Sequence, residues 1–534
     1  MPGKEVFLVE RPIKEQPLFA VSWLFPNTYN VGMSGLGYQL VWWLLEQDTE
    51  LLVKRGFQDW QDPNCQSSEL VGFTVSWELD FINIIAMLKE LGMPILSSER
   101  GDDDAIVFGG GPVLSANPEP FAEIFDVVLL GDAEATVPLF VAAWKEARRL
   151  RSRKERLVRL AAVPGIYVPS LYEVTYKGDK GPVASIKPLD QAAPEKLSKQ
   201  LYVAPPDYLA HTLIVSTDTA WGDIFLAEVV RSCPQECRFC LASFLTRPFR
   251  PVNVEALLAA IDLGLKHTKN IGLLGPSVTE HPQFDQIAEQ LMTRSDARIS
   301  VASVRADSLN ETILLALKKL GQKSVTIAIE SGSERLRTVM KKNLNESEIK
   351  HAVKLIDDSG LQGIKFYGIV GLPHESEADL EETVRLVREL KKEHRRLRFV
   401  FGVSSFVPKA QTPFQWNGRD KRSAEKLEYI RKHLAKAGIE VRPESHNWSD
   451  IQAVISRGDR RLTPVLLAVA AAGGKLGAWK RAWRNLPDNC PDLDYYAFRE
   501  IPQDEVLPWS HLVEAAKTDY LSKHNVAAQL AASS

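Results

Sequence analysis

Short apolar runs alternate with amphipathic stretches along the first 160 residues. Runs of strand length occur at 19–25, 70–76, 105–108 and 127–130, and stretches with helical period at 35–46, 79–91 and 135–150. Loops containing glycine follow the runs, at 26–37, 109–112 and 131–134. This alternation predicts a doubly wound α/β domain over 1–160, in which ligands bind beside such loops at the carboxyl ends of the strands.

A second strand–helix repeat extends from about 210 to 410. Apolar runs lie at 224–230, 270–274, 298–303, 325–329, 363–369 and 399–406, with helical stretches such as 254–267, 311–320 and 346–359 between them. Six βα units predict a partial parallel (β/α)6 barrel over 205–415, with its chemistry at the carboxyl ends of the strands. Residues 161–204 are expected to form a connector containing a short strand pair, 165–168 with 172–176. Residues 416–534 are expected to form a mostly helical C-terminal region.

Composition and charge exclude some classes of protein. Of the 534 residues, 45% are hydrophobic and 25% charged, as in an ordinary globular protein. The 65 Lys and Arg nearly balance the 68 Asp and Glu, so no global basic field indicates nucleic-acid binding. The longest apolar runs fall short of the roughly 20 residues that span a bilayer, and the first residues lack a signal-peptide core. We therefore expect no membrane span and a cytoplasmic location.

Three of the five cysteines lie within eight residues, just after the first predicted barrel strand. Cys233, Cys237 and Cys240 have the spacing C-x3-C-x2-C. A [4Fe–4S] cluster is normally held by four thiolates, so three would leave one iron open. A zinc site would need a fourth ligand nearby, and both His211 and His267 are distant in sequence. Taken alone, the triplet favours a cluster but leaves zinc or ferredoxin-like roles open.

The cysteine spacing resembles the signature of the radical S-adenosylmethionine (radical SAM) superfamily, which usually has an aromatic residue before the last cysteine, as Phe239 is here. The resemblance implies that the three cysteines hold a [4Fe–4S] cluster whose open iron chelates SAM. It also implies that one electron, from a donor such as a flavodoxin or ferredoxin, cleaves SAM to give a 5′-deoxyadenosyl radical that modifies an unknown substrate. It identifies no catalytic residue for that substrate.

The ends of the later strands resemble SAM-binding positions of the same superfamily. Ser277 lies after the second strand, where many members have an acidic residue that is missing here. Arg305, after the third strand, is suited to the SAM carboxylate because its guanidinium is a forked donor. Glu330, after the fourth, matches the acidic residue that commonly holds the ribose hydroxyls. The turn at 367–375 is similar to the G-x-P-x-E turn near the adenine.

The N-terminal domain resembles the cobalamin-binding domain that often precedes radical SAM barrels. Its loops at 108–112 and 130–134 match that domain, but residues 27–32 lack the D-x-H-x-x-G motif whose His binds cobalt. Either cobalamin binds without a protein ligand, or the domain has kept the fold and lost the cofactor. The alternative functions are therefore a cobalamin-dependent radical SAM methyltransferase and, without enzymatic activity, an iron–sulfur sensor or scaffold.

The tail contains three further strings: RGDRR at 457–461, WKRAWR at 479–484 and LPW at 507–509. With residues 27–37, they look like an uncharacterised bacterial branch of cobalamin-type radical SAM proteins, a resemblance that covers nearly the whole chain. The basic residues can form a patch with the tryptophans that suits an RNA or nucleotide partner; they are Arg457, Arg460, Arg461, Lys480, Arg481 and Arg484. The alternative is a helix with its tryptophans packed inward and its basic residues in solvent.

Overall fold

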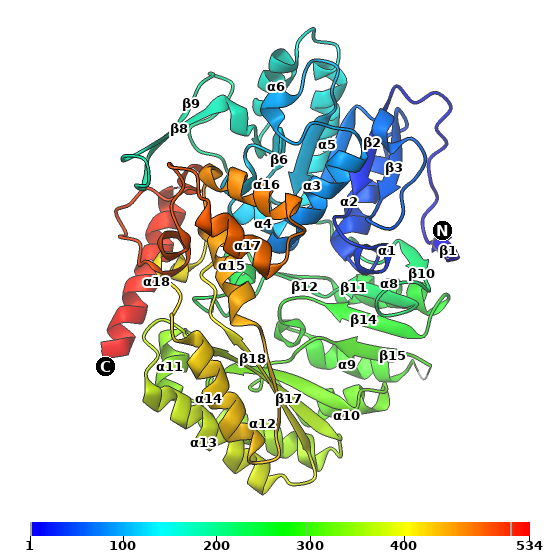
Figure 1. Ribbon diagram of the computed structural model, residues 1–534. Coiled ribbons are helices and arrows are strands. Elements are labelled where there is room, and N and C mark those ends of the chain that lie inside the picture. The colour runs from blue at the N-terminus through cyan, green and yellow to red at the C-terminus, as the bar shows by residue number, and fades with distance from the viewer. Residues whose placement is uncertain (1–2, 295, 513–514, 534) are drawn as a thin grey trace.

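Three parts of the chain are stacked in the computed structural model, which describes residues 3–294, 296–512 and 515–533. An N-terminal α/β layer lies above a parallel barrel, and the C-terminal region runs along one side of both (Figure 1). This mixed α/β architecture confirms the predicted fold class.

The N-terminal sheet has six strands in the order β3-β2-β4-β5-β6-β7. Their bounds are β2 Phe19–Leu24, β3 Leu51–Gly56, β4 Leu70–Thr74, β5 Ile106–Gly110, β6 Val127–Leu129 and β7 Ile166–Tyr167. All neighbours run parallel except β7, which is antiparallel to β6. The five parallel strands have the doubly wound order 2-1-3-4-5. In such sheets the strand order reverses between the first and third strands, here β2 and β4, and a ligand crevice forms there.

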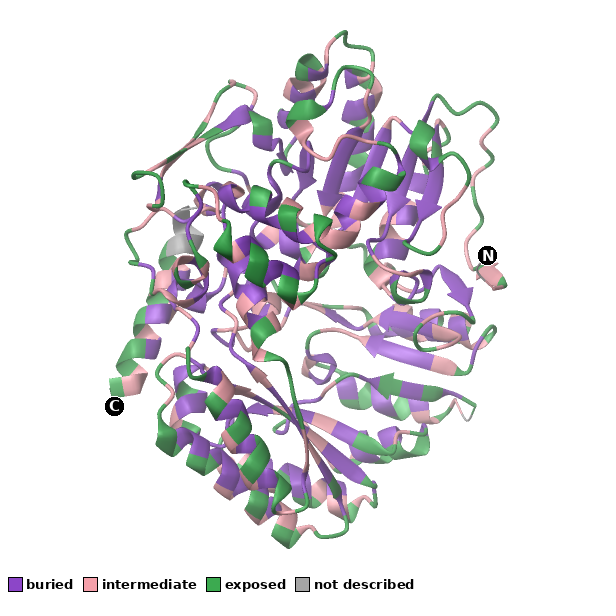
Figure 2. Cartoon of the chain, viewed as in Figure 1, coloured by how far each residue is buried: buried purple, intermediate pink, exposed green. Residues whose placement is uncertain are grey.

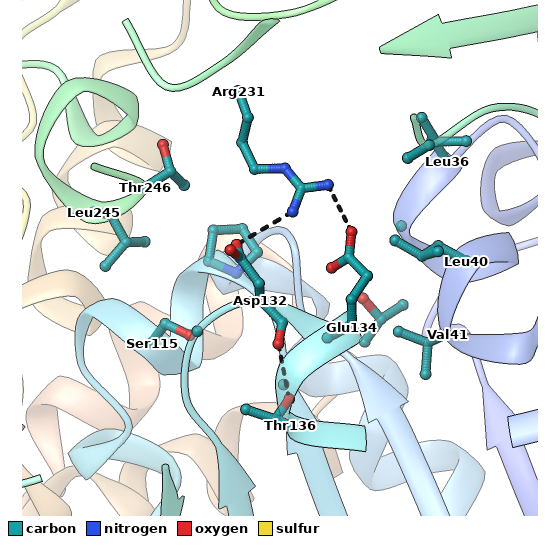
Figure 3. A pocket seen from close by; sticks show the side chains of 18 of the residues that line it. Leu36, Leu40, Val41, Ser115, Asp132, Glu134, Thr136, Arg231, Leu245 and Thr246 are labelled. Atoms are coloured by element: carbon teal, nitrogen blue, oxygen red, sulfur yellow. Dashed lines mark hydrogen bonds and ion pairs between the residues drawn. The ribbon is translucent and has the colours of Figure 1, made fainter. Parts of the chain in front are cut away.

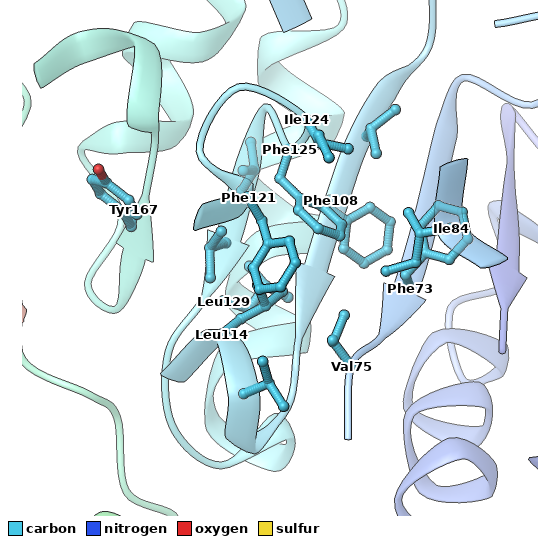
Figure 4. Packing of buried hydrophobic residues seen from close by; sticks show 14 of the residues in the cluster. Phe73, Val75, Ile84, Phe108, Leu114, Phe121, Ile124, Phe125, Leu129 and Tyr167 are labelled. Atoms are coloured by element: carbon cyan, nitrogen blue, oxygen red, sulfur yellow. The ribbon is translucent and has the colours of Figure 1, made fainter. Parts of the chain in front are cut away.

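Aromatic side chains fill the core of this sheet (Figure 4). The ring of Phe108 lies across β4 at Gly72, where a Cβ atom would come within 2.2 Å of it, so only glycine fits. Phe73 meets Phe125 edge to face, with ring centroids 6.2 Å apart. The helices of this layer are α1 Tyr29–Gly32, α2 Leu36–Glu46, α3 Phe81–Glu90, α4 Pro112–Ala116, α5 Ala133–Ala147 and α6 Arg153–Ala161.

The barrel consists of parallel strands in two sheets. The first has the order β11-β14-β15 and the second β16-β17-β18-β19, and a single parallel bridge between Val304 and Ile327 joins them. The strands are β11 Ile224–Glu228, β14 Asn270–Leu274, β15 Arg298–Val301, β16 Ser324–Glu330, β17 Gly363–Val370, β18 Arg398–Ser405 and β19 Glu440–Pro443. The six predicted strands are all present, and β19 adds a seventh that the sequence did not predict.

Amphipathic helices cover the barrel, and a buried apolar cluster separate from that of the N-terminal sheet fills it. The helices are α7 Leu241–Leu245, α8 Val254–Leu265, α9 Phe284–Met292, α10 Glu311–Lys319, α11 Glu334–Val339, α12 Glu346–Asp358, α13 Glu377–Glu393 and α14 Ser423–Ala435. Local sequence determines where several of these helices begin. Asn345 and Glu348, for example, form a capping box at the N-terminus of α12. In Figure 2 their inner faces are buried and their outer faces exposed.

The C-terminal region packs chiefly on the N-terminal layer, with which it shares one hydrophobic core. Its helices are α15 His446–Arg457, α16 Thr463–Ala471, α17 Leu476–Arg484 and α18 Ala515–Ser533. Helix α16 contacts α3, and Trp479 of α17 meets Phe81 edge to face. Helix α18 instead contacts α11 of the barrel.

Short antiparallel pairs connect the parts. They are β1 (Glu5–Phe7) with β10 (Ile214–Ser216), β8 (Tyr172–Tyr176) with β9 (Val183–Pro188), and β12 (Val230–Arg231) with β13 (Arg250–Pro251). The predicted pairing of 165–168 with 172–176 is therefore wrong. Pro169 begins a 3-10 turn between the two segments, so β7 joins the N-terminal sheet while β8 turns away to β9. The division at residues 160, 204 and 415 stays a prediction.

None of the helices in the described ranges is both long and apolar enough to cross a bilayer.

Candidate active site at the barrel mouth

The three clustered cysteines lie in the loop that leaves the first barrel strands. Cys237 is buried and Cys233 and Cys240 are half-buried, all with free thiols. Ser232 and Glu236 have φ of 69° and 55°, so the loop turns back sharply on either side of Cys233. The Cys240 amide donates to the Cys237 carbonyl at 2.9 Å. Burial raises the pKa of Cys237 to about 12, and the nearby Cys240 adds to it.

Burial is also the main cause of the raised pKa of Cys233, and Cys240 raises it further. Because Cys240 affects the pKa of both other cysteines, the three thiols lie close together. Among the described residues, no three His, Cys, Asp or Glu side chains lie close enough to hold a single metal ion. A cube with four irons spreads its thiolates more widely than one ion does, and three free thiols from one loop fit its donor set.

Glu330 lies beside this loop, at the end of β16. Its φ is 63°, a backbone conformation that is rare for any residue but glycine and costs about 1–3 kcal/mol. Its carboxylate accepts a hydrogen bond from Lys342 Nζ at 3.1 Å, and both side chains are buried. The charge of Lys342 also acts to lower the pKa of Cys237 against the larger effect of burial. The strained turn thus places a buried carboxylate–ammonium pair next to Cys237.

Arg305 is buried at the same place, but protein groups occupy its guanidinium. It pairs with Asp307 at 2.7 Å and Glu280 at 3.1 Å, and it donates to the carbonyl groups of Lys342 and Asn343. A SAM carboxylate could reach Arg305 only by displacing one of these partners. The structure nevertheless brings Arg305 near Cys237, whose pKa it lowers slightly.

The other residues expected near SAM lie around this centre. Ser277 is buried in the loop after β14, and Phe239 packs against an apolar cluster formed by α11, the end of β18 and α18. In the turn after β17, Glu375 accepts from the Gly371 amide and from Lys426. Burial raises the pKa of Glu375 to about 6. Of this centre, sequence reasoning missed Lys342, which follows a helix and belongs to no recognisable motif.

The C-terminal helix α18 covers the outer side of the cysteine loop. The Tyr520 hydroxyl donates to Glu236, which lies just before Cys237, at 2.5 Å. Lys341 also donates to Glu236, at 2.7 Å, and the guanidinium of Arg247 lies over the Tyr520 ring. The tail therefore contributes directly to the shape of the loop.

A cavity of about 450 Å³ lies between the carboxyl edge of the N-terminal sheet and the barrel mouth. The two loops that the sequence singled out, 108–112 and 130–134, line it, together with Ser232 next to Cys233. Arg231 from the barrel points into it and pairs with Asp132 and Glu134 from the N-terminal domain (Figure 3). Two domains thus share one pocket beside the cysteine loop.

Residues 27–32, where a cobalt ligand would be expected, do not line this cavity. Tyr29 is buried, and its hydroxyl donates to Glu5 at 2.6 Å. A Cβ atom on Gly32 would come within 2.5 Å of the Phe57 ring, so aromatic side chains fill the space beneath the loop. This part of the domain fits a corrinoid poorly.

The basic patch considered for the tail is not formed by three of its five arginines, those at 457, 460 and 461. Arg457 and Arg461 are buried, and Arg460 pairs with the buried Glu119 at 2.9 Å. These arginines join the tail to other parts of the protein instead of facing solvent. Helix α17 has the alternative arrangement, with Trp479 packed inward and its basic residues exposed; these are Lys480, Arg481 and Arg484.

Two family models match the chain. The model for the N-terminal domain of radical SAM proteins covers residues 62–169, and that of the radical SAM superfamily covers 228–387. The second match begins just before the cysteine loop and includes Arg305, Glu330 and Lys342.

Relatives and solved structures agree with these matches. An uncharacterised protein, MJ0966, from Methanocaldococcus jannaschii is 31% identical over 84% of this chain and 90% of its own. A tRNA-2-methylthio-N(6)-dimethylallyladenosine synthase from Stenotrophomonas maltophilia is 22% identical over 46% of this chain and 54% of its own. The solved structure of the radical SAM enzyme OxsB with aqua-cobalamin and SAM aligns with a TM-score of 0.50, at 14% identity, over 88% of this chain and 70% of that one. At this identity, the likeness to OxsB shows a shared fold and nothing more.

Proposed function

The chain belongs to the radical SAM superfamily, and on that premise we propose that Cys233, Cys237 and Cys240 hold its [4Fe–4S] cluster while Glu330 and Lys342 help to position SAM. Enzymes of this superfamily use the cluster and SAM. When bound, these groups supply reductive cleavage of SAM to a 5′-deoxyadenosyl radical, which here modifies a substrate that is unknown.

The observation that supports this assignment best is the buried Glu330–Lys342 pair next to Cys237. A carboxylate can accept hydrogen bonds from vicinal ribose hydroxyls, as acidic residues do in dinucleotide folds. The ammonium of Lys342 favours negative charge on the thiolate side of the site. Ser277 and Phe239 border the same region, and loops of the N-terminal layer line the cavity next to it. The protein thus orients its cofactors and shields them from side reactions.

The experiment is anaerobic reconstitution with iron and sulfide, reduction with dithionite and assay for 5′-deoxyadenosine. We expect deoxyadenosine from the wild-type protein and none from Cys237→Ala. The matched control is Cys65→Ala, which removes a buried thiol remote from this loop and should retain the activity. A reduced cluster with no deoxyadenosine would overturn SAM cleavage. If SAM also left the EPR signal of the cluster unchanged, a sensor or scaffold would replace the enzyme.

The second candidate function is cobalamin-dependent methyl transfer, suggested by the resemblance of the N-terminal domain to cobalamin-binding domains; the fold of OxsB, a cobalamin-dependent SAM radical enzyme, supports the cobalamin part of this candidate. The cavity beside loops 108–112 and 130–134 has the right position, but residues 27–32 offer no cobalt ligand. Titration of the protein with hydroxocobalamin, followed by its visible spectrum, tests this candidate.

The proposed partners are a flavodoxin or ferredoxin as electron donor, in the cytoplasm, where reducing conditions preserve an iron–sulfur cluster. An RNA substrate is a further candidate, because the exposed face of α17 is basic. Binding of bulk tRNA at low salt should weaken in a Lys480→Ala/Arg481→Ala/Arg484→Ala variant. Equal binding by the wild type and this variant would remove the candidate.

A further inference from the structure

The cavity between the two domains is mostly apolar. On the N-terminal side its wall is formed by side chains that include Trp23, Leu40, Val41, Phe108 and Leu129. It lies at the switch point between β2 and β4, where doubly wound sheets bind their ligands. Its volume of about 450 Å³ falls within the range of small-molecule sites, about 300–1,000 Å³.

The barrel side of the cavity borders the cysteine loop. Ser232, the residue before Cys233, lines it, and so do Gly275 and Pro276 from the loop after β14. Ser277, one of the residues expected near SAM, follows Pro276 directly. A molecule in this cavity would therefore lie next to the proposed cofactor site.

Charged side chains also line the cavity: Arg231, Asp132, Glu134 and Glu228 pair with one another, and Lys199 has an interaction of its own. Arg231 pairs with Glu134 and Glu228, both at 2.8 Å, and with Asp132 at 3.4 Å. Arg250 pairs with Asp132 at 2.5 Å. A charged ligand would have to disrupt this network or stay without a counter-ion, which is costly away from water. The network therefore favours an uncharged ligand.

Gly111 and Gly131, in the loops where a corrinoid would approach the sheet, already pack against protein backbone. A Cβ atom on Gly111 would come within 2.7 Å of the Val75 backbone, and one on Gly131 within 2.1 Å of the Gln200 backbone. The connector segment at Gln200 also bonds to the loop after β6. A corrin ring with its nucleotide tail is several times larger than the ligands of ordinary small-molecule pockets. The cavity therefore suits a smaller molecule.

We propose that this cavity binds the substrate, and that the substrate is an uncharged, predominantly apolar small molecule. The proposal rests on the proposed function, because it places the substrate beside the cysteine loop.

Gly37 allows a clean test. It is the second residue of α2, it lines the cavity, and no atom lies within 4 Å of the position of its Cβ. Gly37→Leu therefore adds a side chain in open space without a clash. Gly477→Leu is a matched control, since Gly477 is the second residue of α17, also follows a leucine and also has open space around it, but does not line the cavity.

The probe is N-phenyl-1-naphthylamine, an uncharged aromatic dye that fluoresces in apolar surroundings. We expect one equivalent to bind to the full-length wild type and to Gly477→Leu, and Gly37→Leu to bind at least tenfold more weakly. Ser115→Leu, from another part of the wall (Figure 3), should also weaken binding. Thermal unfolding of each variant verifies that it is folded.

Saturable dye binding that neither variant weakens, or no dye binding to the wild type, would overturn the proposal. Binding of one equivalent of hydroxocobalamin that excludes the dye would overturn it in favour of a corrinoid. Because the dye assay needs neither the cluster nor SAM, its result is independent of the deoxyadenosine assay. A protein that binds the dye but never releases deoxyadenosine would refute the proposed function and leave the cavity as an apolar binding site that is not a substrate site.

Discussion

At the scale of residues, the barrel mouth contains a buried pair of opposite charges beside the cysteine loop. Glu330 and Lys342 are both nearly inaccessible to solvent, and a buried ion pair often adds little stability because both charges lose their hydration. The backbone of Glu330 is also strained. A costly pair in a strained turn beside a cysteine is better explained by ligand binding than by stability.

Glu330→Gln is expected to weaken SAM binding by about 10- to 100-fold, because hydrogen bonds to a charged group contribute about 1.5–3 kcal/mol. Isothermal titration of the reconstituted protein with SAM measures the change. The control is Glu334→Gln, four residues further on and largely exposed, which should bind SAM as the wild type does. Equal affinity in both variants would contradict the role of Glu330.

Arg460→Ala is expected to destabilise the protein by about 3–5 kcal/mol, because it leaves the buried Glu119 carboxylate without its charged partner. Urea unfolding measures the loss. Lys480→Ala, on the exposed face of α17, should change stability by no more than about 0.5 kcal/mol. A loss of RNA binding in Arg460→Ala would therefore indicate unfolding rather than a lost RNA contact.

At the scale of elements, periodicity was enough to predict most of the molecule. The barrel strands and helices α2, α3 and α5 are buried on one or both faces, so their apolar spacing is regular. Strand β3 escaped prediction because it contains Lys54 and Arg55. Both are buried, and distant groups satisfy them: Lys54 bonds to the Asn64 carbonyl and Arg55 to Glu5. Such partners depend on tertiary structure, which local sequence does not reveal.

Local sequence also failed to predict strand β19 and part of the candidate site. Strand β19 is short, half-exposed and ends in proline, so its pattern resembles a loop. Cysteine spacing and strand ends singled out Cys237, Arg305 and Glu330, which the structure places near one another, while their roles stay a prediction. Lys342 could not be predicted, because only the packing of the loop after α11 brings it to Glu330.

Helix α18 is expected to stabilise the cysteine loop through Tyr520. Tyr520→Phe removes the hydrogen bond to Glu236 and keeps the ring that packs on Phe244. A hydrogen bond contributes about 0.5–1.5 kcal/mol, so we expect the cluster to bleach in air about two- to tenfold faster. Absorbance near the cluster band measures the rate. Lys523→Ala, exposed on the same helix, should bleach at the wild-type rate; if Tyr520→Phe does as well, α18 has no such role.

At the scale of the whole molecule, the tail joins the domains. The N-terminal sheet and the C-terminal region form one hydrophobic core, and Asn117 donates to the carbonyl of Gly458 across their boundary at 2.8 Å. His511, two residues after the tryptophan of the LPW string, is buried at this boundary between the rings of Tyr167 and Tyr172. The strings RGDRR and LPW are therefore structural features of this interface.

This interface should make the protein sensitive to acid. Burial lowers the pKa of His511 from 6.5 to about 4, against the opposing charge of Glu119. The folded protein thus binds fewer protons than the unfolded chain between pH 6.5 and 4. His511 therefore contributes stability that is fully present above pH 6.5 and is lost as the pH falls towards 4. The free energy of unfolding should fall by about 1.4 kcal/mol per pH unit in this window, and by up to about 3 kcal/mol in all.

His511→Phe isolates this effect, because phenylalanine can keep the ring contacts with Tyr167 and Tyr172 but cannot take up a proton. Urea unfolding at several pH values between 4 and 7 should give a shallower slope for this variant than for the wild type. His351→Gln, which removes an exposed histidine of α12, should retain the wild-type slope. If His511→Phe also retains it, the acid sensitivity arises elsewhere, and the burial of a neutral His511 does not link the stability of this interface to pH.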